Sequence, residues 1–194
     1  MRNTKMSRKT KETEIEVKLD LDGKGTYSIE SGIGFLDHML SLFASRSMID
    51  LTVKAKGDFQ VDEHHTVEDV GIVMGKAFSK ALGSRMGIMR YGFFMLPMDE
   101  ALATVSVDLG GRGMLIWNAE FKREKIGDMS TELLYDFFEA FARNCGATLH
   151  IRLEYGRNEH HKAEAIFKGF GMVMRMACEQ DLRRKDIPST KGVI

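Results

Sequence analysis

The chain is poor in proline and cysteine and carries no excess of charge of either sign. Its 194 residues include 2 Pro and 2 Cys, and 28 Lys or Arg residues balance 28 Asp or Glu residues. The balanced charge removes the broad electropositive surface with which proteins attract nucleic-acid phosphates, so we expect no nucleic-acid partner. With 43% hydrophobic residues, the composition is typical of a single globular domain spanning residues 1–194.

Long apolar runs are also missing. The longest, such as residues 91–98, are far shorter than the ~18 residues that a membrane helix needs, and the basic start at residues 2–11 is followed by acidic residues instead of a signal-peptide core. The two cysteines, Cys145 and Cys178, lie in apolar helical patterns without the spacing of a zinc or redox motif. We therefore expect a cytoplasmic protein with no membrane partner, in which both thiols are buried and reduced.

The apolar pattern of the first half predicts strands alternating with helices. Residues 13–21 alternate apolar and polar side chains as a half-buried strand does, and the turn at residues 22–25 predicts that residues 26–30 pair with it as a hairpin. The remaining predicted elements of this half are a helix, a strand and a second helix, at residues 35–46, 49–56 and 65–82.

The second half returns to the same order. Its predicted elements are strands at residues 89–96, 101–109 and 114–119, a helix at 132–144, a strand at 148–154 and a helix at 159–180. The segments around residues 64–68 and 160–164 align at a constant offset, and His38 aligns with Asp136. The repetition predicts an internally duplicated α+β fold of two strand-strand-helix-strand-helix half-domains, at about residues 10–86 and 87–184.

The motif His-His-x-x-Glu occurs twice, at residues 64–68 and 160–164. Adjacent histidines on a helix point about 100° apart, whereas a residue three or four positions later returns to the face of the first pair. Each motif therefore suits two separate metal ions, or a metal and a substrate, better than one chelate. The alternative is that these are capping and surface residues at two helix starts, but composition does not explain why the triplet is repeated.

The candidate metal ligands are five histidines and three carboxylates: His38, His64, His65, Glu68, Asp136, His160, His161 and Glu164. All are nitrogen or oxygen donors, which fits Mn, Fe or Zn and argues against a structural zinc of the Cys-rich type. The set leaves open a two-metal hydrolase, a ferritin-like metal carrier and an assembly protein whose metals only join subunits. The predicted strands argue against the ferritin-like helical bundle.

Five motifs together resemble one enzyme family. They are Gly34–Leu40, Asp62–Asp69, Pro97–Leu102, Gly156–Lys168 and Pro188–Val193. From about Thr10 to the C-terminus, the chain resembles imidazoleglycerol-phosphate dehydratase, a hydro-lyase of histidine biosynthesis. The resemblance implies helices packed between two β-sheets, a homo-oligomeric shell of twenty-four subunits, and catalytic sites between subunits that contain two Mn²⁺ ions per subunit.

The resemblance also implies roles for individual residues. One ion would be held by His38, His65, Glu68 and His161, and the other by His64, Asp136, His160 and Glu164. Asp136 and Arg46 stand where relatives usually carry His, the second of these near the substrate. The implied substrate-binding residues are Glu12, Arg90, Arg112, Ser189, Thr190 and Lys191, the last three in a C-terminal tail at residues 185–194. Two arginines and a lysine suit the substrate phosphate.

The implied reaction removes water from imidazoleglycerol phosphate and gives imidazole acetol phosphate. Two metal ions on the ring nitrogens would stabilise an imidazolate, which expels the neighbouring hydroxyl to form a diazafulvene-like intermediate. A positioned base then takes a proton from the next carbon, and the resulting enol becomes the ketone. The candidates for this acid–base catalysis are Glu12, Glu14 and Glu164, and the sequence does not choose among them.

Overall fold

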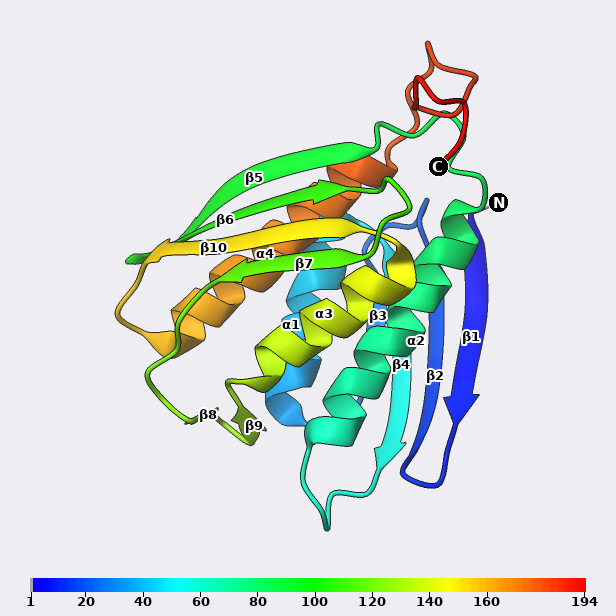
Figure 1. The fold of residues 1–194 in the computed structure, drawn as a ribbon. Helices are drawn as coiled ribbons and strands as arrows, with labels where there is room; N and C mark the ends of the chain where they lie inside the picture. The colour runs from blue at the N-terminus through cyan, green and yellow to red at the C-terminus, as the bar shows by residue number, and fades with distance from the viewer. Residues whose placement is uncertain (1) are drawn as a thin grey trace.

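The computed structural model describes residues 2–194 as two four-stranded sheets with helices between them (Figure 1). The first sheet contains, in spatial order, β1 (Asn3–Lys9), β2 (Thr13–Asp20), β4 (Asp50–Gly57) and β3 (Tyr27–Glu30). The second contains β5 (Tyr91–Met98), β6 (Ala101–Asp108), β10 (Thr148–Tyr155) and β7 (Met114–Asn118). The helices are α1 (Gly34–Ser47), α2 (His64–Leu82), α3 (Leu133–Cys145) and α4 (Glu159–Cys178).

The two sheets have the same topology, which confirms the predicted α+β fold and its internal duplication. In each sheet the first two strands form an antiparallel pair, and the third strand crosses through a helix to run parallel to the fourth. In each half, three strands of the four-stranded sheet therefore precede the first helix. One short hairpin, β8 (Lys125–Ile126) with β9 (Met129–Ser130), lies between β7 and α3 and interrupts the repeat.

The predicted hairpin between residues 13–21 and 26–30 is wrong. Strand β4 lies between β2 and β3 and pairs with both of them. The turn after β2 is held by Asp50 at the start of β4, whose Oδ1 accepts hydrogen bonds from the amides of Lys24 (2.9 Å) and Thr26 (2.8 Å). The turn therefore leads the chain past β4 to the far side of that strand.

Strand β1 is an edge strand that the apolar pattern does not reveal. Its seven residues are mostly polar on both faces, with Met6 the only large apolar side chain among them. It pairs with β2 over its whole length, from Asn3 opposite Asp20 to Lys9 opposite Glu14. The first sheet therefore begins well before residue 10, where the family resemblance starts.

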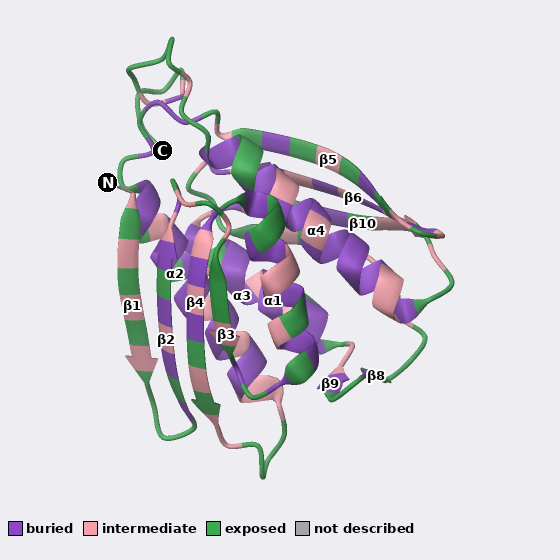
Figure 2. Cartoon of the chain, turned by 180° about the vertical axis from the view of Figure 1, so that it is seen from behind, coloured by how far each residue is buried: buried purple, intermediate pink, exposed green. Residues whose placement is uncertain are grey.

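The helices of one half pack on the helices of the other. Helix α2 covers the first sheet and packs against α3, whereas α4 covers the second sheet and packs against α1. The buried faces meet in the middle of the molecule (Figure 2). Phenylalanine rings join the helices across the halves, with Phe43 stacked 4.8 Å from Phe170 and Phe78 5.3 Å from Phe141. Cys145 and Cys178 are buried here as free thiols.

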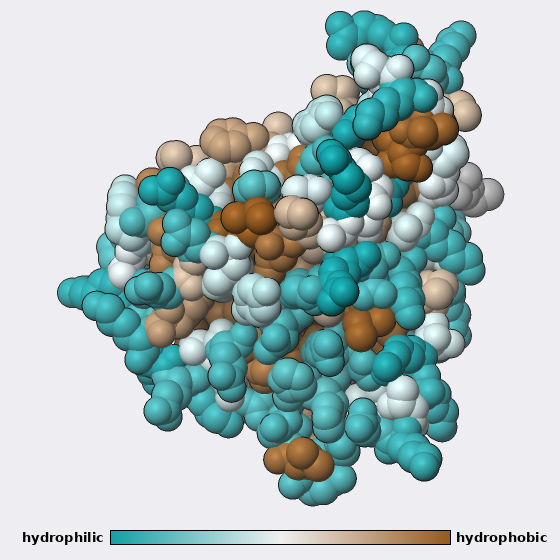
Figure 3. Space-filling model, viewed as in Figure 1, coloured by the Kyte–Doolittle hydropathy of each residue, from teal (hydrophilic) through white to brown (hydrophobic). Residues whose placement is uncertain are grey.

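The outer faces of the two sheets differ in chemistry. The first sheet presents cross-strand ion pairs, among them Lys5 with Glu16 and Lys9 with Glu14, each 2.7 Å apart. On the second sheet, β5 exposes Tyr91, Phe93 and Met95, whose exposed fractions are 58%, 60% and 50%. Brown and tan atoms accordingly gather in the upper part of Figure 3, where β5 and its neighbours lie. Within residues 2–194, no helix is long and apolar enough to span a membrane.

Candidate metal centre

Both His-His-x-x-Glu motifs stand at the first turn of a helix, as predicted. The side chain of Asn158 caps α4, because its Oδ1 accepts hydrogen bonds from the amides of His160 (2.9 Å) and His161 (3.4 Å). Before α2, Asp62 Oδ1 accepts one from the amide of His64 at 2.8 Å. In each motif the first histidine and the glutamate are four residues apart, so the two side chains share one face of the helix.

The tightest cluster joins α1 to α4. His38 Nε2 lies 2.9 Å from Glu164 Oε1, and His160 Nε2 lies 3.1 Å from the same oxygen. One ligand atom from each of these three residues falls within 4.8 Å of the others. We refer to His38, His160 and Glu164 as the His38 cluster. It is built from the first helix of one half and the second helix of the other.

The charge of Glu164 is stabilised by its neighbours. Burial raises the pKa of this carboxyl, but hydrogen bonds from Lys168 and from His38 outweigh that effect and lower the pKa to about 2. Lys168 Nζ bonds the second carboxylate oxygen of Glu164 and also lies 3.0 Å from Met98 Sδ. Glu164 is therefore an ionised candidate ligand that faces two imidazoles.

The duplication places a second cluster in the equivalent position. His64 Nε2 lies 3.9 Å from Glu68 Oε2 and His64 Nδ1 lies 3.8 Å from Asp136 Oδ2. We refer to His64, Glu68 and Asp136 as the His64 cluster. It joins α2 to α3, as the His38 cluster joins α4 to α1, and Asp136 takes the place of His38. Its side chains are further apart than those of the His38 cluster.

The second histidine of each motif turns away from both clusters. His65 Nδ1 lies 3.1 Å from Asp58 Oδ2, and His161 Nδ1 lies 2.7 Å from Glu100 Oε2. These hydrogen bonds raise the pKa of both imidazoles, and the bond from His161 is the main cause that lowers the pKa of Glu100 to about 2. Within one chain the ligands are thus grouped differently from the sets implied by the resemblance, because His38 lies with His160 and Glu164.

The His38 cluster fits a divalent transition metal, whereas His64 faces Glu68 and Asp136 through different ring nitrogens and its cluster is not converged in this way. Ligand bonds of about 2.0–2.2 Å keep any two ligands of one ion within about 4.4 Å of each other, and the ligand atoms of the His38 cluster lie within 4.8 Å of one another, close to this limit. Imidazole nitrogen and carboxylate oxygen suit Mn, Fe or Zn. The His38 cluster offers three candidate ligands, which leaves coordination positions for further donors.

Arg90 and the C-terminal tail, which contain most of the predicted phosphate-binding residues, lie at the opposite end of the sheets from these clusters. Arg90 precedes β5, whereas Glu100, which contacts His161, follows it. The 8 residues of β5 span about 27 Å at roughly 3.4 Å per residue. Arg90 is bound to Asp108 through Nε (2.6 Å) and Nη2 (3.0 Å), and its Nη1 donates to the carbonyl of Pro188 at 2.7 Å. The arginine thereby fastens the C-terminal tail.

The predicted substrate residues of the C-terminal tail are also near this end. Ser189 and Thr190 line a pocket with Arg90, and Lys191 is exposed beside them with its amide bonded to Ser189 Oγ at 3.2 Å. Arg112 is exposed in the loop before β7. Arg46 is exposed in the last turn of α1, beside α4 at Gly171.

The three predicted acid–base candidates occupy different environments. Glu12 is exposed in the turn between β1 and β2, close enough to His65 to raise the pKa of that imidazole. Glu14 lies on the outer face of the first sheet, 2.7 Å from Lys9 Nζ. Glu164 belongs to the His38 cluster. Because Glu12 and Glu100 follow the first strand of their respective halves, they are topological equivalents.

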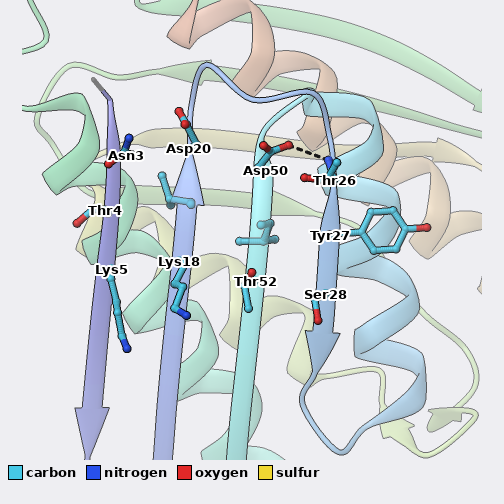
Figure 4. Close-up of a pocket in the computed structure, with 12 residues that line it drawn as sticks. Asn3, Thr4, Lys5, Lys18, Asp20, Thr26, Tyr27, Ser28, Asp50 and Thr52 are labelled. Atoms are coloured by element: carbon cyan, nitrogen blue, oxygen red, sulfur yellow. Dashed lines mark hydrogen bonds between the residues drawn. The ribbon is translucent and has the colours of Figure 1, made fainter.

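Another pocket lies on the outer face of the first sheet and has a different character. Its lining includes Lys5, Lys18, Asp20, Asp50 and Thr52, with no histidine (Figure 4). It opens at the end of β4 remote from the start of α2. No residue of either metal cluster contributes to it, so it is not the centre that the motifs predict.

Three residues that hold the candidate ligands in place are not predicted from the sequence. Asp58 and Glu100 orient His65 and His161, and Lys168 holds Glu164. Glu100 and Lys168 lie inside two of the motifs that carry the family resemblance. Asp58 lies outside all five, and only its place in the loop before α2 brings it to His65.

The chain is similar in sequence to one family of known proteins. The family model for imidazoleglycerol-phosphate dehydratase matches residues 31–174. The chain is 54% identical over 192 residues to the imidazoleglycerol-phosphate dehydratase of Oceanobacillus iheyensis, covering 99% of each chain. It is 52% identical over 195 residues to that of Cereibacter sphaeroides, covering 100% of both.

Solved structures agree with the sequence comparison. The crystal structure of imidazoleglycerol-phosphate dehydratase from Staphylococcus aureus superposes with a TM-score of 0.83 at 37% identity, covering 92% of this chain and 100% of that one. The Pyrococcus furiosus enzyme, crystallised in complex with (S)-C348, gives a TM-score of 0.85 at 36% identity, covering 97% and 100%. The similarity therefore includes both halves of the fold.

Proposed function

The chain belongs to the imidazoleglycerol-phosphate dehydratase family, which makes it a hydro-lyase of histidine biosynthesis, and we propose that two Mn²⁺ ions per subunit serve its dehydration reaction. The observation that carries this proposal is the His38 cluster, whose three donor atoms lie within 4.8 Å of one another. The His64 cluster stands at the equivalent position of the duplicated fold and supports a second ion. When bound, such ions supply Lewis acids that stabilise negative charge on the imidazole ring of the substrate.

Glu12 is the best placed of the three candidates to move the substrate proton. Glu14 is paired with Lys9 on the outer face of the sheet, and Glu164 has a pKa of about 2 and is surrounded by metal-ligand histidines. Within residues 2–194 the Glu12 carboxylate makes no hydrogen bond or ion pair and lies on the His65 side of the fold. We propose that it takes the proton from the carbon next to the one that loses hydroxide, with departure of hydroxide giving the diazafulvene-like intermediate.

The distance between the metal clusters and the predicted phosphate-binding residues supports a site shared between subunits. The clusters follow the ends of β4 and β10, whereas Arg90 and the tail at residues 185–194 lie at the other end of the sheets (Figure 1). A substrate that touches metal and arginine together must therefore receive them from different chains. This supports a homo-oligomer, for which the resemblance implies twenty-four subunits. Arg112, Ser189, Thr190 and Lys191 complete the proposed phosphate clamp.

The second histidines of the two motifs fit the same arrangement. His65 and His161 are oriented by Asp58 and Glu100 and remain unused by the clusters of their own chain. We propose that each completes the coordination of an ion held mainly by a neighbouring subunit. The whole chain then works as one catalytic domain of two half-repeats, residues 10–86 and 87–184, in the cytoplasm.

Water loss from imidazoleglycerol phosphate tests the proposal. Protein stripped of metal is titrated with Mn²⁺ while imidazole acetol phosphate is followed. We expect activity to saturate near two Mn²⁺ ions per chain. Full activity in the stripped protein would refute the role of the metal, whereas tight Mn²⁺ binding without turnover would refute the substrate assignment.

A further inference from the structure

Residues 119–132 connect β7 to α3 and have no counterpart in the first half. There, β3 leads to α1 through residues 31–33 alone. The longer segment contains the β8–β9 hairpin, whose Ile126 and Met129 are buried. The interruption of an otherwise regular repeat lies at the end of the molecule where the metal clusters are found (Figure 1).

The segment is fixed to the start of α4 by a buried ion pair. Glu159 and Lys162 lie 2.9 Å apart, and both side chains are only 6% exposed. Glu159 Oε2 accepts a hydrogen bond from the amide of Lys122 at 3.2 Å, and Lys162 Nζ donates one to the carbonyl of Glu120 at 3.3 Å. Because Glu159 directly precedes His160, this contact fixes the backbone that carries the motif.

The same segment caps α1. Helix α1 receives no side-chain cap from its own N-cap residue. Instead, the carboxylate of Asp128 accepts hydrogen bonds from the amides of Gly34 (2.7 Å) and Phe35 (3.1 Å). The ring of Phe35 in turn meets the imidazole of His160 edge to face at 5.3 Å. Asp128 is thus linked to the His38 cluster through a single residue.

The hairpin is also bonded to the start of α2 and continues into α3. Glu63 Oε1 accepts hydrogen bonds from the amide and hydroxyl of Ser130, at 2.9 Å and 2.7 Å, and from Lys125 Nζ at 3.2 Å. Glu63 directly precedes His64. The chain enters α3 shortly after Ser130, and the first turn of that helix carries Asp136. The contacts therefore reach both helices of the His64 cluster.

We propose that residues 119–132 act as a positioning segment that sets the four helix starts relative to one another and so preorganises both metal clusters. Asp128 is the positioning residue for the His38 cluster and Glu63 is the positioning residue for the His64 cluster. Neither touches a ligand atom. The inference rests on the proposed function, because it assigns the segment a role in binding the two ions.

The test measures Mn²⁺ binding by calorimetry on the assembled protein after removal of metal with a chelator. For Asp128→Ala we expect one of the two binding steps to weaken about tenfold or more and the other to stay unchanged, as is typical when groups supporting metal ligands are removed. Asp128→Asn keeps an acceptor oxygen and should recover most of the affinity. Glu124→Ala is the matched control, since this exposed carboxylate in the same segment makes no hydrogen bond or ion pair within residues 2–194.

Hydrogen exchange of the metal-free protein provides a second readout. Asp128→Ala should speed exchange at residues 33–38 and leave residues 64–70 protected. Glu63→Gln should instead speed exchange at residues 64–70 and 125–130. Wild-type affinity at both sites in Asp128→Ala would overturn the inference, as would an equal loss at both sites with exchange raised throughout. If the wild-type protein bound no Mn²⁺, the proposed function would fail, and the exchange pattern would still decide whether the segment positions these helices.

Discussion

The carbonyl oxygen of Phe141 on α3 occupies the space that a side chain at Gly75 on α2 needs, since a Cβ there would lie 2.6 Å from it. The duplication repeats this relationship between α4 and α1, where a Cβ on Gly171 would lie 2.8 Å from the carbonyl oxygen of Phe43. Both obstructing atoms belong to the backbone, so they cannot rotate away. The two glycines therefore fix the spacing of the helix pairs that carry the clusters.

Gly75→Ala should lower the stability of the protein. Alanine is favoured over glycine in a helix by about 1 kcal/mol, but forced separation of two packed helices costs about 1–3 kcal/mol. We expect a net loss of up to about 2 kcal/mol, measured as a lower midpoint of thermal unfolding. Lys76→Ala, at an exposed position of the same helix, should leave the midpoint nearly unchanged. Equal midpoints for both variants would show that the helices separate without cost.

Substitution of two histidines, one in the His38 cluster and one on the protein surface, tests the metal centre. His160→Ala removes a ligand of the His38 cluster and should lower the Mn²⁺ content by one ion per chain and abolish turnover. His150→Ala removes an exposed imidazole from β10, outside both clusters, and should keep both properties. Elemental analysis and product formation check the pair. Retention of both ions by His160→Ala would exclude the cluster as a binding site.

Mixing two inactive variants tests whether the site is shared. In hybrids of His160→Ala with Arg90→Ala, some sites combine an intact metal cluster from one chain with an intact arginine from another. Random assembly should restore roughly a quarter of wild-type activity. The variants are unfolded together, refolded as a mixture and assayed, with each variant refolded alone as the control. A mixture as inactive as its components would indicate that every site lies within one chain.

The buried ion pair between Glu159 and Lys162 should show strong coupling. Removing one partner leaves an uncompensated buried charge and should cost about 3–5 kcal/mol, whereas removing both should restore much of that loss. The exposed pair Glu139–Arg143, 3.2 Å apart with the arginine 69% exposed, should contribute less than about 0.5 kcal/mol. Double-mutant cycles in urea compare the two pairs. Additive losses at Glu159 and Lys162 would contradict the coupling.

The sequence predicts the elements that have one apolar face. The alternation of β2 and the helical spacing of α2 follow from burial on one side, and their predicted bounds agree with the structure within two residues. Strand β1 is missed because its side chains are polar on both faces. The position of β3 is missed because pairing with β4 depends on the helical crossover, which local turn residues do not encode.

The sequence predicts candidate ligands for the site more readily than it predicts which of them lie together. The repeated His-His-x-x-Glu motif places candidate ligands on α2 and α4, but His38 joins His160 only because α1 packs against α4. Likewise, Asp128 reaches α1 across a long stretch of sequence. Such contacts arise from the packing of distant segments, so spacing within a motif carries no information about them.

The crossed pairing of helices between the halves bears on the origin of the chain. The first half alone in water would expose the apolar faces of α1 and α2 that pack on α4 and α3. Pairing with a second identical copy is the simplest way to bury these faces. In such a pair both ligand sets would be the same. Joining the copies in one gene lets each set change alone, and the chain carries such a difference, with Asp136 at the position equivalent to His38.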